Sequence, residues 1–284
     1  MSSLFSGLEK FGLTGMKDTE IYEKEEEKTE KKIVEPKAPH FPEESEMIFD
    51  KTYRCPVCDD VLSIGVKTTL CRKCINRVER VAEPSCMRCG KPLEDETMQY
   101  CYSCKNNQHL YEQGKAAFVY NRSMKSSIAA FKYGARKEYG RYYAVELAKK
   151  HESWIKKTGA QALIPVPIHK ERHKKRGYNQ AKVIADYLEG ETGIPVIDDY
   201  LIRIKNTEAL KELSAVERKA SLEDAFLVSE TSKLLYRNLR CVILVDDIYT
   251  TGSTINECAA TLKKSGVLKV YFLCACIGKD QGGE

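Results

Sequence analysis

Apolar and polar positions change their spacing near residue 111. From there on, short apolar runs alternate with segments in which apolar residues recur every three or four positions. The runs predict buried strands and the other segments predict helices. We expect strands at 116–120, 162–167 and 241–245, and helices at 124–131, 141–155, 180–191 and 254–264. This order predicts an α/β domain in which helices flank a mostly parallel sheet.

Polar residues follow the strand expected at 241–245. Two carboxylates, Asp246 and Asp247 (the acidic pair), stand where this strand should end, and small hydroxyl residues around Gly252 lead into the next helix. A helix N-terminus leaves backbone N–H groups unpaired and carries partial positive charge, so it favours an anion such as a phosphate monoester. Carboxylates only accept hydrogen bonds and therefore suit a polyol. A ribose 5-phosphate meets both requirements.

The small residues after the acidic pair form what we call the hydroxyl loop. Its members are Thr250, Thr251, Gly252, Ser253 and Thr254. The stretch 242–254 resembles the phosphoribosyl pyrophosphate (PRPP) motif of type I phosphoribosyltransferases. The resemblance implies that the acidic pair holds the ribose hydroxyls and, indirectly, Mg²⁺, while the loop holds the 5′-phosphate. The alternatives are an ordinary turn before a helix, or a site that binds PRPP or a nucleotide without turnover, because a binding site does not imply catalysis.

A dense group of positive charges follows the strand expected at 162–167. Five of the seven residues at 170–176 are Lys or Arg. Ligands bind beyond the carboxyl ends of parallel strands, so this segment is expected to face the same crevice as the acidic pair. We assign Lys175, Arg176 and the turn at Val166 to pyrophosphate, and Arg176, with the acidic pair, to catalysis. A solvated basic loop is the alternative.

Eight of the twelve cysteines form four CxxC pairs. Two such pairs complete a tetrahedral Cys₄ zinc site of the closed, structural kind. Each half of the segment repeats one plan, a knuckle followed by a short helix, which favours joining the first two pairs and the last two; an interleaved arrangement is the alternative. The predicted ligands of two structural zinc ions are Cys55, Cys58, Cys71 and Cys74, and Cys86, Cys89, Cys101 and Cys104.

The order of the motifs narrows the resemblance. Four CxxC pairs, IPVPIH at 164–169, RGYNQA at 176–181 and VDDIYTTGST at 245–254 look like the ComF family of phosphoribosyltransferase-like proteins, over residues 53–278. The family resemblance implies a type I phosphoribosyltransferase fold with an N-terminal double zinc module, and pentosyl transfer from PRPP with Mg²⁺. It also implies a link to DNA uptake in natural competence, as a partner of the translocation machinery.

The acceptor and the occurrence of catalysis stay open at this point. Leu210 and Ser221 stand where the family usually has Gln and Asn, so the acceptor is undefined. The segment at 204–222 is nevertheless a candidate for closing over a ligand. The alternative function is a non-catalytic nucleic-acid-binding accessory protein, or a PRPP sensor, that keeps the fold as a scaffold.

Charge is distributed unevenly along the chain, whose net charge is +5. Residues 1–50 hold 7 Lys and Arg against 13 Asp and Glu and have little to bury, so disorder is expected there. The remainder is basic, which favours phosphate-bearing partners such as a pyrophosphate or single-stranded DNA. We divide the chain into an acidic leader at 1–50, a double zinc-binding module at 51–110 and a phosphoribosyltransferase-like domain at 111–284.

No apolar run approaches the ~20 residues that a membrane-spanning helix needs, so no membrane span is expected. The first residues also lack a basic segment followed by an apolar one, the pattern of a secretory signal. A cytoplasmic location is therefore expected.

Overall fold

The computed structural model describes residues 54–62, 70–206 and 224–279. The chain divides into two compact units, Met1–Lys51 and Thr52–Glu284, and every described residue belongs to the second. The acidic leader lies outside the described residues, as does most of the segment considered for closing over a ligand, with Leu210 and Ser221.

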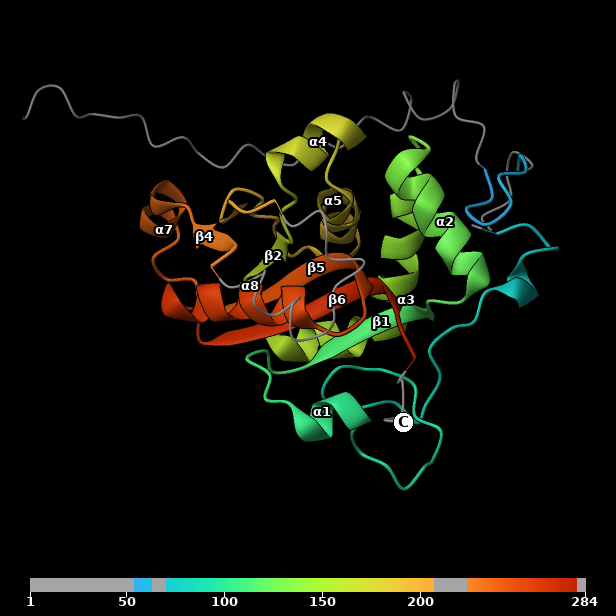
Figure 1. Ribbon diagram of the computed structural model, residues 1–284, viewed down its shortest axis with the longest axis horizontal. Coiled ribbons are helices and arrows are strands. Elements are labelled where there is room, and N and C mark those ends of the chain that lie inside the picture. Colours follow the sequence, from blue (N-terminus) through green and yellow to red (C-terminus); the bar gives the residue numbers. More distant parts are fainter. Residues whose placement is uncertain (1–53, 63–69, 207–223, 280–284) are drawn as a thin grey trace, which may run out of the picture. The chain divides into compact units, whose positions relative to one another are not determined.

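Four parallel strands form the central sheet. In spatial order they are β1 (Gly114–Val119), β6 (Lys269–Ile277), β5 (Cys241–Tyr249) and β2 (Ala162–Pro165) (Figure 1). In the register, Leu244 of β5 lies between Ile164 of β2 and Phe272 of β6. The middle strands β5 and β6 bury their apolar side chains on both faces, as a parallel sheet requires.

Helices cover both faces of this sheet (Figure 1). One face carries α2 (Arg122–Tyr133), α3 (Tyr139–Thr158) and α5 (Gln180–Thr192), and the other carries α8 (Ser253–Lys264). Asparagine caps start two of them: the Asn121 side chain accepts from the N–H of Met124, and that of Asn179 accepts from Ala181. The mostly parallel sheet between helices confirms the predicted α/β class.

Shorter elements complete the described part of the chain. α4 (Lys170–Arg176) lies between β2 and α5, and α7 (Glu230–Leu235) precedes β5. β3 (Leu201–Arg203) and β4 (Phe226–Val228) form a separate antiparallel pair, while η3 (Ile75–Arg77) and α1 (Tyr102–Asn106) are the short helices of the zinc module. Among the helices in the described ranges, none has the length and apolar character needed to cross a membrane.

Two elements differ from their expected bounds where the difference concerns the site. β5 continues to Tyr249 because its pairing with β6 runs past Asp246, so the acidic pair lies within the strand and not after it. The basic segment is helix α4, which starts where the His169 side chain accepts from the N–H of Glu171 and ends at Gly177, with a φ of 79°.

The zinc module packs against one edge of the sheet. Residues 79–81 pair antiparallel with β1: the N–H of Val81 donates to Ala117 O at 3.0 Å, and that of Val119 donates to Glu79 O at 2.8 Å. At the opposite edge, Leu163 of β2 makes a parallel bridge to Val196. Both edge strands are therefore paired beyond the four-stranded sheet, which protects them from pairing with other chains.

Candidate functional site

A cavity of about 800 Å³ opens at the carboxyl ends of β2 and β5. Nine of the ten residues predicted to bind PRPP line it; Gly252 is the exception. They are Val166, Lys175, Arg176, Asp246, Asp247, Thr250, Thr251, Ser253 and Thr254. Segments far apart in the sequence therefore meet at one cavity, while the role of each residue stays a prediction.

The acidic pair sits in a buried, charged environment. The backbone N–H of Asp247 donates to Asp246 Oδ1 at 2.8 Å, and Lys132 of α2 places its Nζ 2.6 Å from Asp247 Oδ2. Burial, reinforced by the charge of Asp247, raises the pKa of Asp246 to about 7. Burial lowers the pKa of Lys132, but the combined attraction of Asp247 and Asp246 outweighs it, so that the lysine pKa is raised. Two carboxylates and one ammonium thus share the site.

The hydroxyl loop turns at Gly252, whose φ of 80° lies in the left-handed region. A Cβ at this position would lie 2.3 Å from the hydroxyl oxygen of Tyr249, so glycine is required both by conformation and by space. Thr251 Oγ1 and Ser253 Oγ lie 3.0 Å apart. Gly252 has no side chain to cap α8, which leaves the N–H groups of the first turn for a ligand or water.

Helix α4 supplies the basic wall of the cavity through Arg172, Lys175 and Arg176. The guanidinium of Arg176 donates to Gln180 Oε1 at 3.0 Å and to the Tyr133 hydroxyl at 3.2 Å, and lies 5.1 Å from the centre of the Tyr133 ring. These contacts hold its charge at the cavity. The described lining residues include five cationic side chains and two carboxylates, a balance that favours an anionic ligand.

Asn179 joins the turn after β2 to the start of α5. Its Nδ2 donates to Val166 O at 3.0 Å, and its Oδ1 accepts from the N–H of Ala181 at 3.1 Å. The N–H of Val166 donates to Val245 O on the neighbouring strand at 2.9 Å. The RGYNQA motif therefore fixes the position of the Val166 turn in addition to supplying Arg176.

Several lining residues are ones that sequence reasoning did not assign to the site. They are Tyr120, Lys132, Tyr133, Asn179, Gln180 and Arg203, among others. Lys132 and Tyr133 come from α2, Arg203 comes from β3 and Tyr120 follows β1, and none of these segments carries a recognisable ligand motif, whereas Asn179 and Gln180 belong to the RGYNQA motif. For Lys132 the available signal is weak, a lone lysine between two aromatic residues in the last turn of an amphipathic helix.

The cysteines form two clusters of four. Within each cluster the sulfur atoms lie within 4.8 Å of one another, and the clusters are Cys55, Cys58, Cys71 and Cys74, and Cys86, Cys89, Cys101 and Cys104. This confirms the sequential pairing of the CxxC units and excludes the interleaved one. Four thiolates at this spacing fit a tetrahedral zinc ion whose positions are all filled by protein, which is the structural kind of site.

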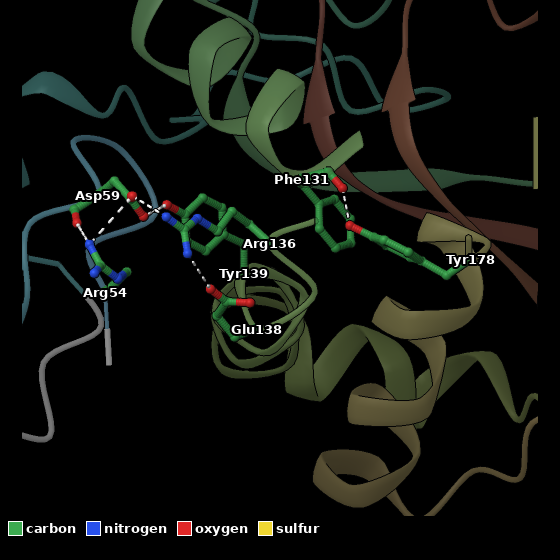
Figure 2. A network of polar contacts seen from close by, with 7 residues as sticks. All are labelled: Arg54, Asp59, Phe131, Arg136, Glu138, Tyr139 and Tyr178. Atoms are coloured by element: carbon green, nitrogen blue, oxygen red, sulfur yellow. Dashed lines mark hydrogen bonds and ion pairs between the residues drawn. The ribbon is translucent and has the colours of Figure 1, made fainter. Parts of the chain in front are cut away.

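Asp59 attaches the first cluster to the junction of α2 and α3 (Figure 2). Its carboxylate pairs with the guanidinium of Arg136 and accepts from the Tyr139 hydroxyl at 2.7 Å. Figure 2 also shows the Tyr178 hydroxyl donating to Phe131 O, which ties the end of α2 to the segment between α4 and α5. The second contact holds α2 directly, and the first holds the connection from α2 to α3; α2 is the helix that supplies the lysine beside the acidic pair.

Comparisons with known proteins agree with these features. Residues 46–105 match the double zinc ribbon domain. Competence protein F of Haemophilus influenzae is 32% identical over 226 residues, which cover 77% of this chain and 94% of the relative. The chain belongs to the ComF family.

Two further relatives support membership of the ComF family. Competence protein ComFC of Bacillus subtilis is 26% identical over 228 residues, or 75% of this chain and 89% of that protein. DNA utilization protein YhgH of Escherichia coli is 26% identical over 225 residues, or 78% of this chain and 96% of that protein. The resemblance drawn from the order of the motifs is thereby confirmed.

Proposed function

We propose that this ComF-family chain binds PRPP with Mg²⁺ in the cavity and transfers the phosphoribosyl group to an acceptor. The observation that carries the proposal is the convergence of three kinds of group on one cavity: the acidic pair, the hydroxyl loop and the basic helix α4. A ligand that satisfies all three carries vicinal hydroxyls, a phosphate monoester and a second, highly charged group. PRPP has these three parts on one ribose ring.

The size and charge of the cavity support this ligand. Its volume of about 800 Å³ falls within the range of roughly 300–1,000 Å³ that is common for small-molecule sites. The excess of cations over carboxylates on its walls compensates a polyanion. The carboxylate oxygens of the acidic pair also suit Mg²⁺, which prefers oxygen ligands and commonly keeps several of its waters.

The proposed reaction breaks the bond between C1 of the ribose and pyrophosphate, whose oxygen takes the electron pair, and forms a bond from C1 to the acceptor. Positive charge develops on the ribose ring while negative charge develops on the leaving pyrophosphate. Lys175 and Arg176 stabilise the leaving group, and the acidic pair orients the ribose through its hydroxyls. Mg²⁺, when bound with PRPP, neutralises part of the pyrophosphate charge.

We also propose that the chain acts in DNA uptake with the competence machinery. The names of its relatives, two competence proteins and a DNA utilization protein, support this proposal. Single-stranded DNA is the candidate partner, and Arg122 and Lys125 of α2 are exposed cations that suit phosphate contacts. Two other basic residues of this region, Lys132 and Arg136, are paired with Asp247 and Asp59. They are therefore not expected to bind DNA.

Titration calorimetry with PRPP and Mg²⁺ tests the binding site, and a screen for pyrophosphate release with nucleobases and amines tests transfer. Lys175→Met and Lys174→Met form a matched pair, because these neighbours lose the same charge but only Lys175 lines the cavity. We expect only Lys175→Met to weaken PRPP binding. Failure of the wild-type chain to bind PRPP would overturn the proposal, and binding without pyrophosphate release across the screen would favour a PRPP sensor.

A further inference from the structure

Tyr111 and Tyr249 meet hydroxyl to hydroxyl in the core, next to the hydroxyl loop. Their oxygen atoms lie 2.7 Å apart, and the two side chains are almost fully buried. The ring of Tyr249 stacks on Phe272 with centres 4.7 Å apart, while the ring of Tyr111 meets Phe272 edge-on at 5.0 Å. Three packed rings therefore fix both hydroxyl groups in place.

Tyr249 supports the turn of the hydroxyl loop. It is the last residue of β5, and the loop folds back over it so closely that a Cβ on Gly252 would lie 2.3 Å from the tyrosine oxygen and 2.7 Å from Cζ. The end of the Tyr249 ring is thus the surface on which Gly252 rests. A shift of this ring would move the turn, because a close-packed protein interior has little empty space to accommodate the shift.

The segment that carries Tyr111 also contacts the helix that follows the loop. The N–H of Leu110 donates to Asn256 Oδ1 at 2.7 Å, and the N–H of Asn256 donates to Gly252 O at 2.8 Å. Residues 110 and 111 therefore touch both ends of the loop, the strand before it and the first turn of α8 after it.

The same segment is bonded to the second cysteine cluster. The guanidinium of Arg88, inside the CMRC knuckle at 86–89, donates to Tyr111 O at 3.0 Å. The N–H of Gly114 donates back to Arg88 O at 2.8 Å. A continuous series of contacts thus runs from the second cluster through Tyr111 and Tyr249 to the hydroxyl loop. The first cluster is attached elsewhere, through Asp59.

We propose that Tyr111 and Tyr249 are positioning residues for the hydroxyl loop, through which the second cysteine cluster holds the loop in its binding conformation. This gives one half of the zinc module a part in ligand binding in addition to stability. The identity of the ligand rests on the proposed function, but the coupling of the cluster to the loop does not.

Tyrosine-to-phenylalanine variants test the proposal while keeping the ring packing. The set consists of Tyr249→Phe, Tyr111→Phe, the double variant and Tyr139→Phe, a control that removes a hydroxyl bonded to the first cluster's knuckle. Hydrogen exchange across 249–256 without ligand reports loop opening. Calorimetry then compares ribose 5-phosphate, which needs the loop, with inorganic pyrophosphate and Mg²⁺, which engage α4.

We expect faster exchange across the loop in both single variants and a fall of about threefold to tenfold in affinity for ribose 5-phosphate, with pyrophosphate affinity unchanged. The loss of binding free energy for ribose 5-phosphate in the double variant should be smaller than the sum of the losses in the two single variants, because neither hydroxyl is then left unpaired. The Tyr139→Phe control should leave loop exchange and both affinities unchanged.

The outcomes separate this inference from the proposed function. Unchanged loop exchange in Tyr249→Phe overturns the positioning role whether or not any ligand binds. An equal loss of pyrophosphate affinity also overturns it, because that result indicates general loosening of the domain. Faster loop exchange in a chain whose wild type binds no ribose 5-phosphate supports the positioning role of the tyrosines and argues against the proposed ligand.

Discussion

Lys132 Nζ lies 2.6 Å from Asp247 Oδ2, and this ion pair joins α2 to β5 at the cavity. The lysine side chain is 19% exposed and that of the aspartate 10%, so water screens neither charge well. Each charge depends on the other, because an unpaired charge in such a place is costly. The ion pair with Lys132 uses Oδ2 of Asp247, and Oδ1 of Asp247 is the oxygen that we expect to accept a hydrogen bond from a ribose hydroxyl.

Asp247→Ala is expected to remove two interactions at once. Loss of the ion pair should lower the free energy of unfolding by up to about 3 kcal/mol, since Lys132 is left without its partner. Loss of charge-assisted hydrogen bonds, worth roughly 1.5–3 kcal/mol, should lower PRPP affinity about tenfold to a hundredfold. Urea denaturation and titration calorimetry measure the two effects separately.

The double variant Asp247→Ala with Lys132→Met is the control for this prediction. Removing both charges should restore much of the stability, because the Lys132 ammonium is no longer left without the carboxylate of Asp247, but should not restore PRPP affinity. Recovery of affinity in the double variant would show that Asp247 acts only as a partner of Lys132 and does not contact the ligand.

The raised pKa of Asp246 makes stability and ligand binding depend on pH in opposite directions. Its pKa rises from 3.8 to about 7 on folding, so between these values the folded chain holds a proton that the unfolded chain has lost. This contribution to stability is full below the lower value and is lost as pH rises through about 7. Without ligand, the melting temperature should therefore fall between about pH 4 and about pH 7 and level off above that range.

PRPP affinity should rise between about pH 6 and about pH 8, because Asp246 of the folded chain ionises there and the ionised carboxylate is the better acceptor for ribose hydroxyls. Asp246→Asn is the matched control. Its melting temperature should not decrease with pH through this group, and its PRPP affinity should be low at every pH. The ionisation of PRPP itself also changes with pH, but that change is common to both chains. Parallel pH profiles for wild type and Asp246→Asn would contradict the assignment of the titrating group.

Much of the fold follows from local patterns, and the site follows only in part. The apolar run of β5 and the hydroxyl loop after it are short, contiguous signals, so the sequence locates the acidic pair and the loop together. Lys132 is different, because its role depends on the packing of α2 beside β5, which no local pattern encodes. Helix α4 also could not be predicted, because the dense charge at 170–176 is as typical of a solvated loop as of a helix.

The zinc module shows a similar limit. The spacing of the cysteines predicts both clusters, because metal ligation requires only local turns. The spacing does not reveal that residues 79–81 extend the sheet beside β1, or that Tyr111 reaches Tyr249. These are contacts between distant segments, and the sequence marks them only as ordinary apolar or aromatic positions.

Gly252→Ala tests the close packing of the hydroxyl loop. A side chain in the left-handed region costs about 1–2 kcal/mol, and the clash with Tyr249 should add roughly 1–3 kcal/mol. Gly193→Ala is the matched control, because Gly193 has a φ of 72° but nothing within 4 Å of the added Cβ. We expect Gly193→Ala to show only the cost of a side chain in the left-handed region, and to keep the wild-type affinity for ribose 5-phosphate. Equal costs in the two variants would argue against the close packing.

Metal analysis of the purified chain should find two zinc ions, and the single tryptophan should distinguish the two sites. Trp154 Nε1 donates to Gln113 Oε1 at 2.5 Å, and Gln113 Nε2 donates to Met87 O, inside the second cluster's knuckle, at 2.7 Å. Loss of the second zinc should free this knuckle and expose the indole to water, which shifts its emission to longer wavelength.

Cys58→Ser and Cys104→Ser make this comparison, since each removes one half-buried ligand from a different cluster. Each should reduce the zinc content to about one ion per chain and lower the melting temperature by at least about 5 °C, because binding free energy of a structural metal is folding free energy. Only Cys104→Ser should shift the Trp154 emission while the chain is still folded. Equal shifts in both variants would mean that the tryptophan reports general unfolding, and fewer than two zinc ions in the wild type would reject the assignment of both clusters as zinc sites.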